Sequence, residues 1–118
     1  MQYLLLIYND ESNWNTLSEP EGAKILKEFG EFTQEIMASG NLKGGNRLHD
    51  VSKATTVRVK DGKKVVTDGP FAETKEQLGG YYLIEAADLD EATTIAARIP
   101  AARMGSIEVR PVWEMARP

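Results

Sequence analysis

The sequence predicts an α+β fold of the ferredoxin-like type, with elements in the order β-α-β-β-α-β and one inserted β-hairpin. Two stretches carry apolar side chains at helical spacing, strand-like stretches flank each of them, and an Asp-Gly pair separates two alternating runs. The chain has 118 residues, of which 42% are hydrophobic, so we expect one domain over residues 1–118.

The first strand and the first helix have clear signals. Residues 2–8 are apolar on both alternating faces, as in a central strand covered on both sides. A helix is expected over roughly 19–39, because Ser18 and Glu21 have capping-box spacing and Gly40 suits a helix end. Its buried stripe comprises Ile25, Phe29, Phe32 and Ile36.

The middle of the chain predicts further strands. Residues 41–48 are rich in glycine and predict a weak or bulged strand. Residues 54–67 predict a hairpin, because Asp61-Gly62 lies between two alternating runs. A loop at 68–77 and a strand at 80–86 follow.

The end of the chain completes the pattern. Asp88 is expected to cap a second helix that Pro100 ends, with Ala92 and Ile95 on its buried face. The last strand is expected over 106–114 at a sheet edge, because Pro111 cannot donate a ladder hydrogen bond.

One face of this sheet needs a cover. Two helices cover one face only, yet the first strand is apolar on both. We expect a second copy to pack sheet against sheet, which gives a homodimeric α+β barrel with a cleft between the sheets. The alternative is a monomer that tolerates an apolar strand face.

Composition excludes several functional classes. The net charge of −4 argues against nucleic acid as a partner. Without cysteine and with His49 as the single histidine, disulfides, thiolate nucleophiles and cysteine-based metal sites are excluded, and no metal or cofactor is expected. The apolar start is shorter than a membrane span and lacks a basic leader, so we expect a cytoplasmic protein without a membrane partner.

Residues 67–82 concentrate the chemistry-bearing side chains. Asp68 could accept backbone amides in the turn that Gly69-Pro70 forms. Alternatively, Asp68 and Glu73 could enter a partly desolvated cleft and move a proton. Spacing does not decide between these interpretations.

Other candidates lie nearby. Tyr81 and Tyr82 point to opposite faces of a strand, so one could line the cleft with its hydroxyl as a donor. His49 is either an exposed loop residue or a titrating group beside Asp50. The strand arginines at 47, 58 and 110 could bind a substrate carboxylate or equally pair with Glu85 or Glu108 across the sheet, and Arg58 is the preferred substrate anchor.

The motif Asp68-Gly69-Pro70-Phe71-Ala72-Glu73-Thr74-Lys75-Glu76, followed by Leu78-Gly79-Gly80-Tyr81-Tyr82, resembles the YCII-related family and specifically its DGPF-motif branch. Further similarity at Tyr3–Tyr8, Ala54–Arg58, Asp90–Ala92 and Ile107–Val112 extends the resemblance over essentially the whole chain. It implies a ferredoxin-like protomer in a dimeric α+β barrel, in agreement with the pattern above.

The resemblance also shapes the expected function. Some relatives act on muconolactone-type compounds, and a histidine–aspartate pair is proposed there as an acid/base dyad. The first helix of this chain contains no histidine, so Asp68 and Glu73 carry the catalytic hypothesis. Phe71, Tyr81, Tyr82, His49 and Arg58 are the expected substrate contacts.

We therefore expect a homodimer that binds a small anionic or lactone-like molecule in an inter-sheet cleft, with cofactor-independent acid/base chemistry if it is an enzyme. The alternative is a non-catalytic accessory module of transcription regulation, because some DGPF-branch proteins are linked to sigma factors.

Overall fold

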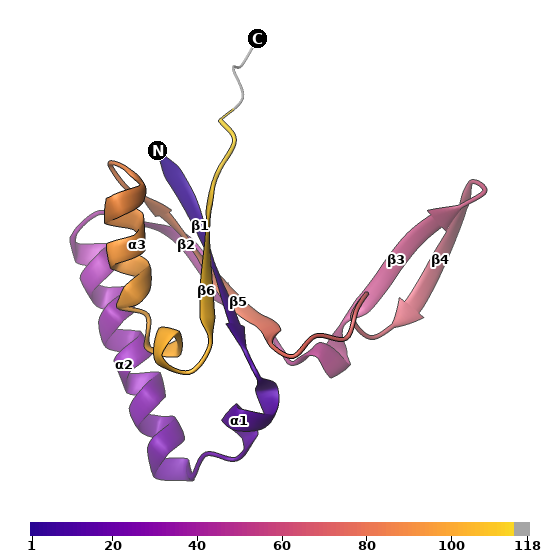
Figure 1. The fold of residues 1–118 in the computed structure, drawn as a ribbon, viewed down its shortest axis with the longest axis horizontal. Coiled ribbons are helices and arrows are strands. Elements are labelled where there is room, and N and C mark those ends of the chain that lie inside the picture. Colours follow the sequence, from indigo (N-terminus) through magenta and orange to yellow (C-terminus); the bar gives the residue numbers. More distant parts are fainter. Residues whose placement is uncertain (115–118) are drawn as a thin grey trace.

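A computed structural model describes residues 1–114 and shows a four-stranded antiparallel sheet with helices on one face (Figure 1). The strand order is β2-β5-β1-β6, with β1 at Gln2–Asn9, β2 at Leu42–Arg47, β5 at Gln77–Glu85 and β6 at Ser106–Pro111. The chain follows the predicted β-α-β-β-α-β order, and the inserted hairpin forms a separate two-stranded sheet. The α+β prediction is confirmed.

Strand β1 lies in the middle of the sheet, as its sequence predicts, between β5 and β6. Its alternate residues Tyr3, Leu5 and Ile7 are buried beneath the helices. Leu4 and Leu6 point to the other face, where they are half-buried. We call that second face, which no helix of the described chain covers, the open face.

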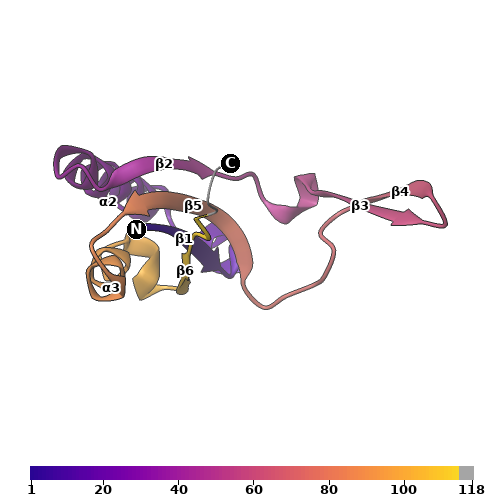
Figure 2. The ribbon, with the colours of Figure 1, turned by 90° about the horizontal axis from the view of Figure 1, so that it is seen from above.

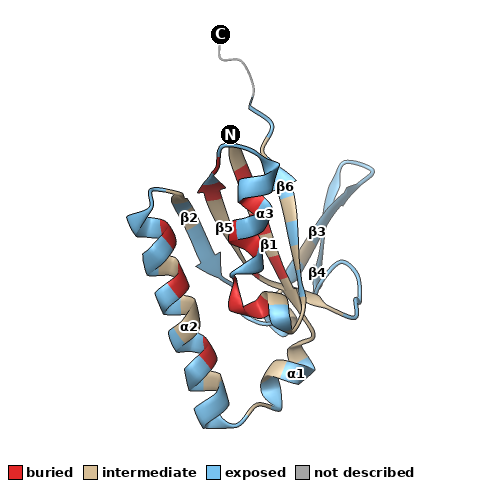
Figure 3. Cartoon of the chain, turned by 60° about the vertical axis from the view of Figure 1, so that its left-hand side comes forward, coloured by how far each residue is buried: buried red, intermediate tan, exposed pale blue. Residues whose placement is uncertain are grey.

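Helices α2 (Glu19–Ala38) and α3 (Leu89–Ala97) cover the first face, and Figure 3 shows their buried residues on the sides that meet the sheet. Ser18 accepts a hydrogen bond from the Glu21 amide, and the Glu21 carboxylate accepts one from the Ser18 amide. The predicted capping box is therefore confirmed. The core consists of buried apolar side chains from β1, β5, α2, α3 and the turn η2 (Pro100–Arg103), with Leu5, Ile36, Ile84 and Ile99 fully buried.

The capping box makes stability depend on pH. The hydrogen bonds from the Ser18 hydroxyl and then the Ser18 amide hold the pKa of Glu21 below its usual range. A carboxyl with a lowered pKa stabilises the fold above its unfolded pKa, and that contribution is lost as the pH falls through the folded value.

We expect Ser18→Ala to lower the free energy of unfolding by about 1 kcal/mol at pH 7. Because the variant lacks the bond that lowers the pKa of Glu21, its difference from wild type should shrink below about pH 4. Urea unfolding at pH 7 and pH 3 measures both values. Thr93→Ala, which removes a hydroxyl bonded to the Asp90 carbonyl of α3, is the control. A difference that stays constant with pH would contradict the prediction.

The neighbouring strands β2 and β5 both contain glycines. The pairing of β1 with β5 shifts register between Ile7 and Tyr8, which places a bulge at Gly79. Strand β2 also shifts register, between Leu42 and Gly44, as expected of a bulged strand. A Cβ on Gly80 would lie 2.9 Å from the Asn46 carbonyl oxygen, so this glycine allows β2 and β5 to approach.

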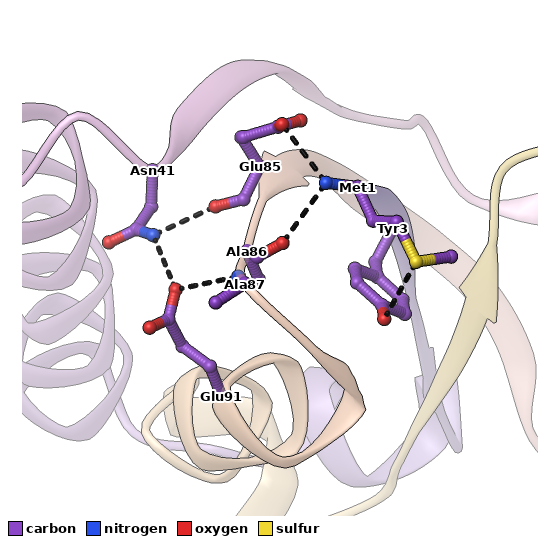
Figure 4. A network of polar contacts seen from close by, with 7 residues as sticks. All are labelled: Met1, Tyr3, Asn41, Glu85, Ala86, Ala87 and Glu91. Carbon is purple, nitrogen blue, oxygen red and sulfur yellow. Dashed lines mark hydrogen bonds and ion pairs between the residues drawn. The ribbon is translucent and has the colours of Figure 1, made fainter. Parts of the chain in front are cut away.

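A network of polar contacts joins the elements at the end of the sheet where β1 begins and β5 ends (Figure 4). The Met1 ammonium donates to the Glu85 carboxylate at 3.0 Å, and the Asn41 amide donates to the Glu85 carbonyl at 2.8 Å. The Glu91 carboxylate accepts from Asn41 and from the Ala87 backbone amide. These contacts join the connection between α2 and β2 to β5 and α3, at the end opposite the groove described below.

Strands β3 (Thr55–Lys60) and β4 (Lys63–Asp68) form a hairpin that projects from the sheet, and we call residues 55–68 the arm. Asp61 and Gly62 have φ values of 51° and 76°, so the predicted two-residue turn is confirmed. Figure 2 shows the arm extending beyond the β2 and β5 end of the sheet. The arm pairs with no strand of the described sheet.

Some boundaries differ from those predicted. Strand β6 ends at Pro111 rather than residue 114, because proline ends the ladder, although its edge position is confirmed. Strand β5 begins at Gln77, three residues earlier than expected, where Gln77 pairs with Asn9. The short helix α1 (Glu11–Asn15) was not predicted, because five residues are too few for a periodic pattern.

Candidate functional site

A groove of about 900 Å³ lies on the helix-covered side of the sheet, at the end where β1 and β2 finish and β5 begins. It is surrounded by helices α1 and α2, by strands β2 and β5, and by residues 48–50, which lead from β2 toward the arm. This size is typical of sites for small molecules.

The floor and one wall of the groove are aromatic and apolar. Phe29 and Leu26 line it from α2, Tyr82 from β5 and Trp14 from α1. The Tyr82 ring packs edge-to-face on Phe32, with centroids 5.3 Å apart and planes at 72°. Such surfaces suit a flat ring.

The hydroxyl of Tyr82 donates its proton to a hydrogen bond within the protein. Thr33 donates its hydroxyl proton to the Phe29 carbonyl at 2.8 Å, and its oxygen lies 2.8 Å from the Tyr82 hydroxyl. Since the Thr33 proton is used, Tyr82 is the donor of the second bond. Tyr82 therefore offers a ligand an acceptor oxygen.

The Tyr81 hydroxyl, in contrast, can donate a hydrogen bond. Its hydroxyl oxygen accepts from the Asn46 amide at 2.8 Å, so its proton is free to donate. The register places Tyr81 opposite Leu6, on the open face, and Tyr82 opposite Leu5, on the helix side. The prediction that the two tyrosines face opposite sides of the sheet is confirmed. Both residues border the groove, but only Tyr82 has its side chain on the helix-covered side where the groove lies.

A cationic group stands at one end of the groove. The Arg47 guanidinium lies over the Trp14 ring, 5.4 Å from its centroid, and makes no salt bridge among residues 1–114. This cation–π contact orients the side chain and leaves its N–H donors available. His49 and Asp50 line the groove beside Arg47, and both are exposed.

Helix α1 is held in place as the end wall of the groove. Asp10 caps it by accepting from the Ser12 amide at 3.0 Å, and the hydroxyl and amide of Ser12 hold the pKa of Asp10 below its usual range. The Glu11 amide donates to Gln77, and the Glu11 carboxylate accepts from the Val51 amide. Trp14 is therefore anchored to β5 and to the turn η1 (Val51–Lys53).

The structure separates the residues that the sequence proposed as one site. Tyr81, Tyr82 and His49 line the groove. Arg58 lies on the arm, and Asp68, Phe71 and Glu73 lie where the arm returns to β5; all four are exposed and none lines the groove of its own chain.

Asp68 illustrates the difference between the two interpretations made from the sequence. The bond that closes the base of the arm joins the Gly69 amide to the Ala54 carbonyl, at 2.7 Å. No hydrogen bond to the Asp68 carboxylate occurs among residues 1–114. The carboxylate is neither occupied by turn amides nor placed in the groove.

Sequence reasoning did not select four groove residues: Trp14, Phe29 as a wall residue, Thr33 and Arg47. Trp14 follows the Asp10 capping signal, and Thr33 is a polar residue beside the apolar stripe of α2, so both had a local signal. Arg47 was considered as a strand arginine, but only the fold reveals its contact with Trp14.

A model of the YCII-related domain matches residues 1–116. The chain belongs to the YCII-related family. This YCII-related chain is 41% identical over 114 residues to an uncharacterized protein of Rhizobium meliloti (strain 1021), a match that covers 95% of this chain and 92% of the relative. The predicted family is therefore confirmed, and its DGPF-motif branch stays a prediction.

The YCII-related chain is also similar to a solved structure, 5-chloro-2-hydroxyhydroquinone dehydrochlorinase (TftG) from Burkholderia phenoliruptrix AC1100 in complex with 2,5-dihydroxybenzoquinone. The TM-score is 0.56 at 13% identity, and the match covers 98% of this chain and 96% of the other. This likeness supports the α+β fold. In the described part of the YCII-related chain, no helix is long and apolar enough to cross a membrane, and no cluster of three potential metal ligands occurs.

Proposed function

We propose that this protein binds a small, flat, acidic molecule in the groove and works as a homodimer. The contact that carries the proposal is the Arg47 guanidinium held over Trp14 at the end of an aromatic groove. Because this guanidinium forms no salt bridge among residues 1–114, it can fork to a carboxylate or an enolate, while the aromatic wall holds the ring.

The ligand of the structural neighbour is a suitable small, flat, acidic molecule with which to test the groove. TftG is solved with 2,5-dihydroxybenzoquinone, a flat ring whose acidic hydroxyl groups ionise readily. We propose that the groove accepts molecules of this shape and charge.

For a catalytic role, His49 is the groove residue whose imidazole nitrogens can both accept and donate a proton. Tyr82 would accept a hydrogen bond from the bound molecule. Asp68 and Glu73 remain predicted catalytic carboxylates, and Arg58 and Phe71 remain predicted ligand contacts, all at positions outside the groove of their own chain. Cofactor-independent acid/base chemistry is the reaction class that these groups support.

The open face supports the dimer. Leu4, Leu6, Tyr8, Tyr81 and Leu83 lie on that face and are half-buried in a single chain. A second copy that covers them would bury their remaining apolar surface.

Binding of 2,5-dihydroxybenzoquinone tests the proposal. We expect Arg47→Ala to weaken binding at least about tenfold, because a charge-assisted contact contributes about 1.5 kcal/mol or more. Isothermal titration calorimetry measures the affinity, and loss of Trp14 fluorescence in a Trp113→Phe background locates the ligand.

Two basic residues serve as comparisons in this experiment. Lys24→Ala is the control, because Lys24 is exposed on α2, outside the groove and away from the open face. Arg58→Ala tests the anchor chosen from sequence. Equal affinity of Arg47→Ala and wild type would contradict the proposal, and absence of binding in wild type would favour the non-catalytic interaction module.

A further inference from the structure

Every residue of the arm except the half-buried Thr56 is exposed, although one face of the arm is apolar. Val57 and Val66 are directly paired, and Val59 follows on the same face. Their exposed fractions are 57%, 53% and 71%. A two-stranded hairpin alone is marginally stable in water, so this apolar face needs a contact surface.

The arm also differs in charge from the rest of the chain. Residues 55–68 contain four basic and two acidic residues and carry +2, whereas the whole chain carries −4, so the remainder carries −6. The basic residues concentrate at the tip, where Lys60, Lys63 and Lys64 surround the turn. The arm tip, residues 60–64, is therefore complementary to an acidic surface.

An acidic surface of this kind borders the groove. Glu11 and Asp50 line it, and Asp10 lies beside Glu11. We call Glu11 and Asp50 the acidic rim. Arg47 and His49 also line the groove, and neither forms a salt bridge with Glu11 or Asp50.

The tip cannot reach the rim of its own chain. Asp50 precedes the arm by five residues and therefore lies at its base, while each strand of the arm has six residues and spans about 20 Å. A paired hairpin holds its tip at this distance from its base. A tip that contacts a rim must belong to a second molecule.

We propose that the arm of a second copy docks across the groove, so that its Lys63 and Lys64 contact the acidic rim and its valine face becomes buried. The contact is reciprocal in a two-fold dimer, so each groove is completed by two subunits. The docked lysines add positive charge at the mouth and attract the acidic ligand. This inference rests on the proposed function for the identity of that ligand.

Charge reversal in trans tests the docking. One variant carries Lys63→Glu and Lys64→Glu, and the other carries Glu11→Lys and Asp50→Lys. Each variant alone pairs like charges at both contacts, whereas a mixed dimer pairs opposite charges at both. We expect native mass spectrometry of an equal mixture to find at least about 80% mixed dimers, against roughly half for random pairing. Salt at 1 M should return the fraction to about half.

The control replaces two exposed lysines outside the arm, Lys24→Glu with Lys43→Glu, and changes the net charge equally. Mixed with the rim variant, it should give about half mixed dimers. If reversal at Glu11 prevents folding, Asp50→Lys alone replaces the rim variant, since the Asp50 carboxylate bonds only to Ser52 within residues 1–114. Random pairing of the arm and rim variants, or only monomers in every sample, would overturn the docking.

Ligand binding separates this inference from the proposed function. Lys63→Glu with Lys64→Glu should weaken 2,5-dihydroxybenzoquinone binding about threefold, although neither lysine lines the groove of its own chain. If Arg47→Ala weakens binding and the lysine variant does not, the groove function stands and the composite site is wrong.

Discussion

Leu5→Ala should lower the free energy of unfolding by about 3 kcal/mol at any protein concentration. The Leu5 side chain is completely buried between β1 and the helices, in contact with the core of a single chain. Its removal leaves a cavity that the packed neighbours fill only partly. Urea unfolding followed by circular dichroism measures the loss.

Leu6→Ala is the matched comparison, because the same truncation falls on the next residue of the same strand. Leu6 points to the open face and is half-buried. If a second copy covers that face, the cost of Leu6→Ala should rise with protein concentration as dimers form. Equal costs for the two variants, both independent of concentration, would contradict a covered open face.

Gly80→Ala should lower the free energy of unfolding by about 2 kcal/mol and loosen the groove. Its Cβ would lie 2.9 Å from the Asn46 carbonyl oxygen and 3.5 Å from the Arg47 Cα. Backbone atoms of a paired strand move only at the expense of the ladder, so overpacking here separates β2 from β5. Amide hydrogen exchange should become faster in β2, the strand that carries Arg47.

Gly79→Ala is the control for this prediction. A Cβ at Gly79 has no heavy atom within 4 Å, and φ there is not positive. An alanine that fits without strain restricts the unfolded chain, so we expect no loss of stability or a gain of about 0.5 kcal/mol. Equal destabilisation by both substitutions would show that the bulge, rather than the approach of Asn46, requires the glycines.

Local signals predicted most of the fold because each acts within a few residues. The capping box at Ser18, the Asp61-Gly62 turn and the alternation of β1 each correspond to an observed element. The edge position of β6 was predicted from Pro111, because proline cannot donate a ladder hydrogen bond. Helix α1 was not predicted, because its position depends on hydrogen bonds with Gln77 and Val51, which are distant in sequence.

The candidate site was predicted less well. Residues close in sequence, such as Asp68 and Tyr82, seemed to share one cleft, yet the first stands at the base of the arm and the second on the groove floor. Sequence proximity does not report which side of a turn or sheet a side chain occupies. The groove instead joins Trp14, Arg47 and Tyr82, which come from three different elements.

By itself, the sequence determined the α+β class, the order of its elements, the family and the presence of a single histidine. The class and the order follow from periodicity and local turn chemistry, the family from its motifs, and the single histidine from composition. Only the tertiary structure decided that Arg47 lies over Trp14, and that the hairpin projects as a basic arm with an apolar face. The physical reason is that both properties depend on pairings between distant segments, which bring Arg47 to the end wall at Trp14 and leave the arm outside the sheet.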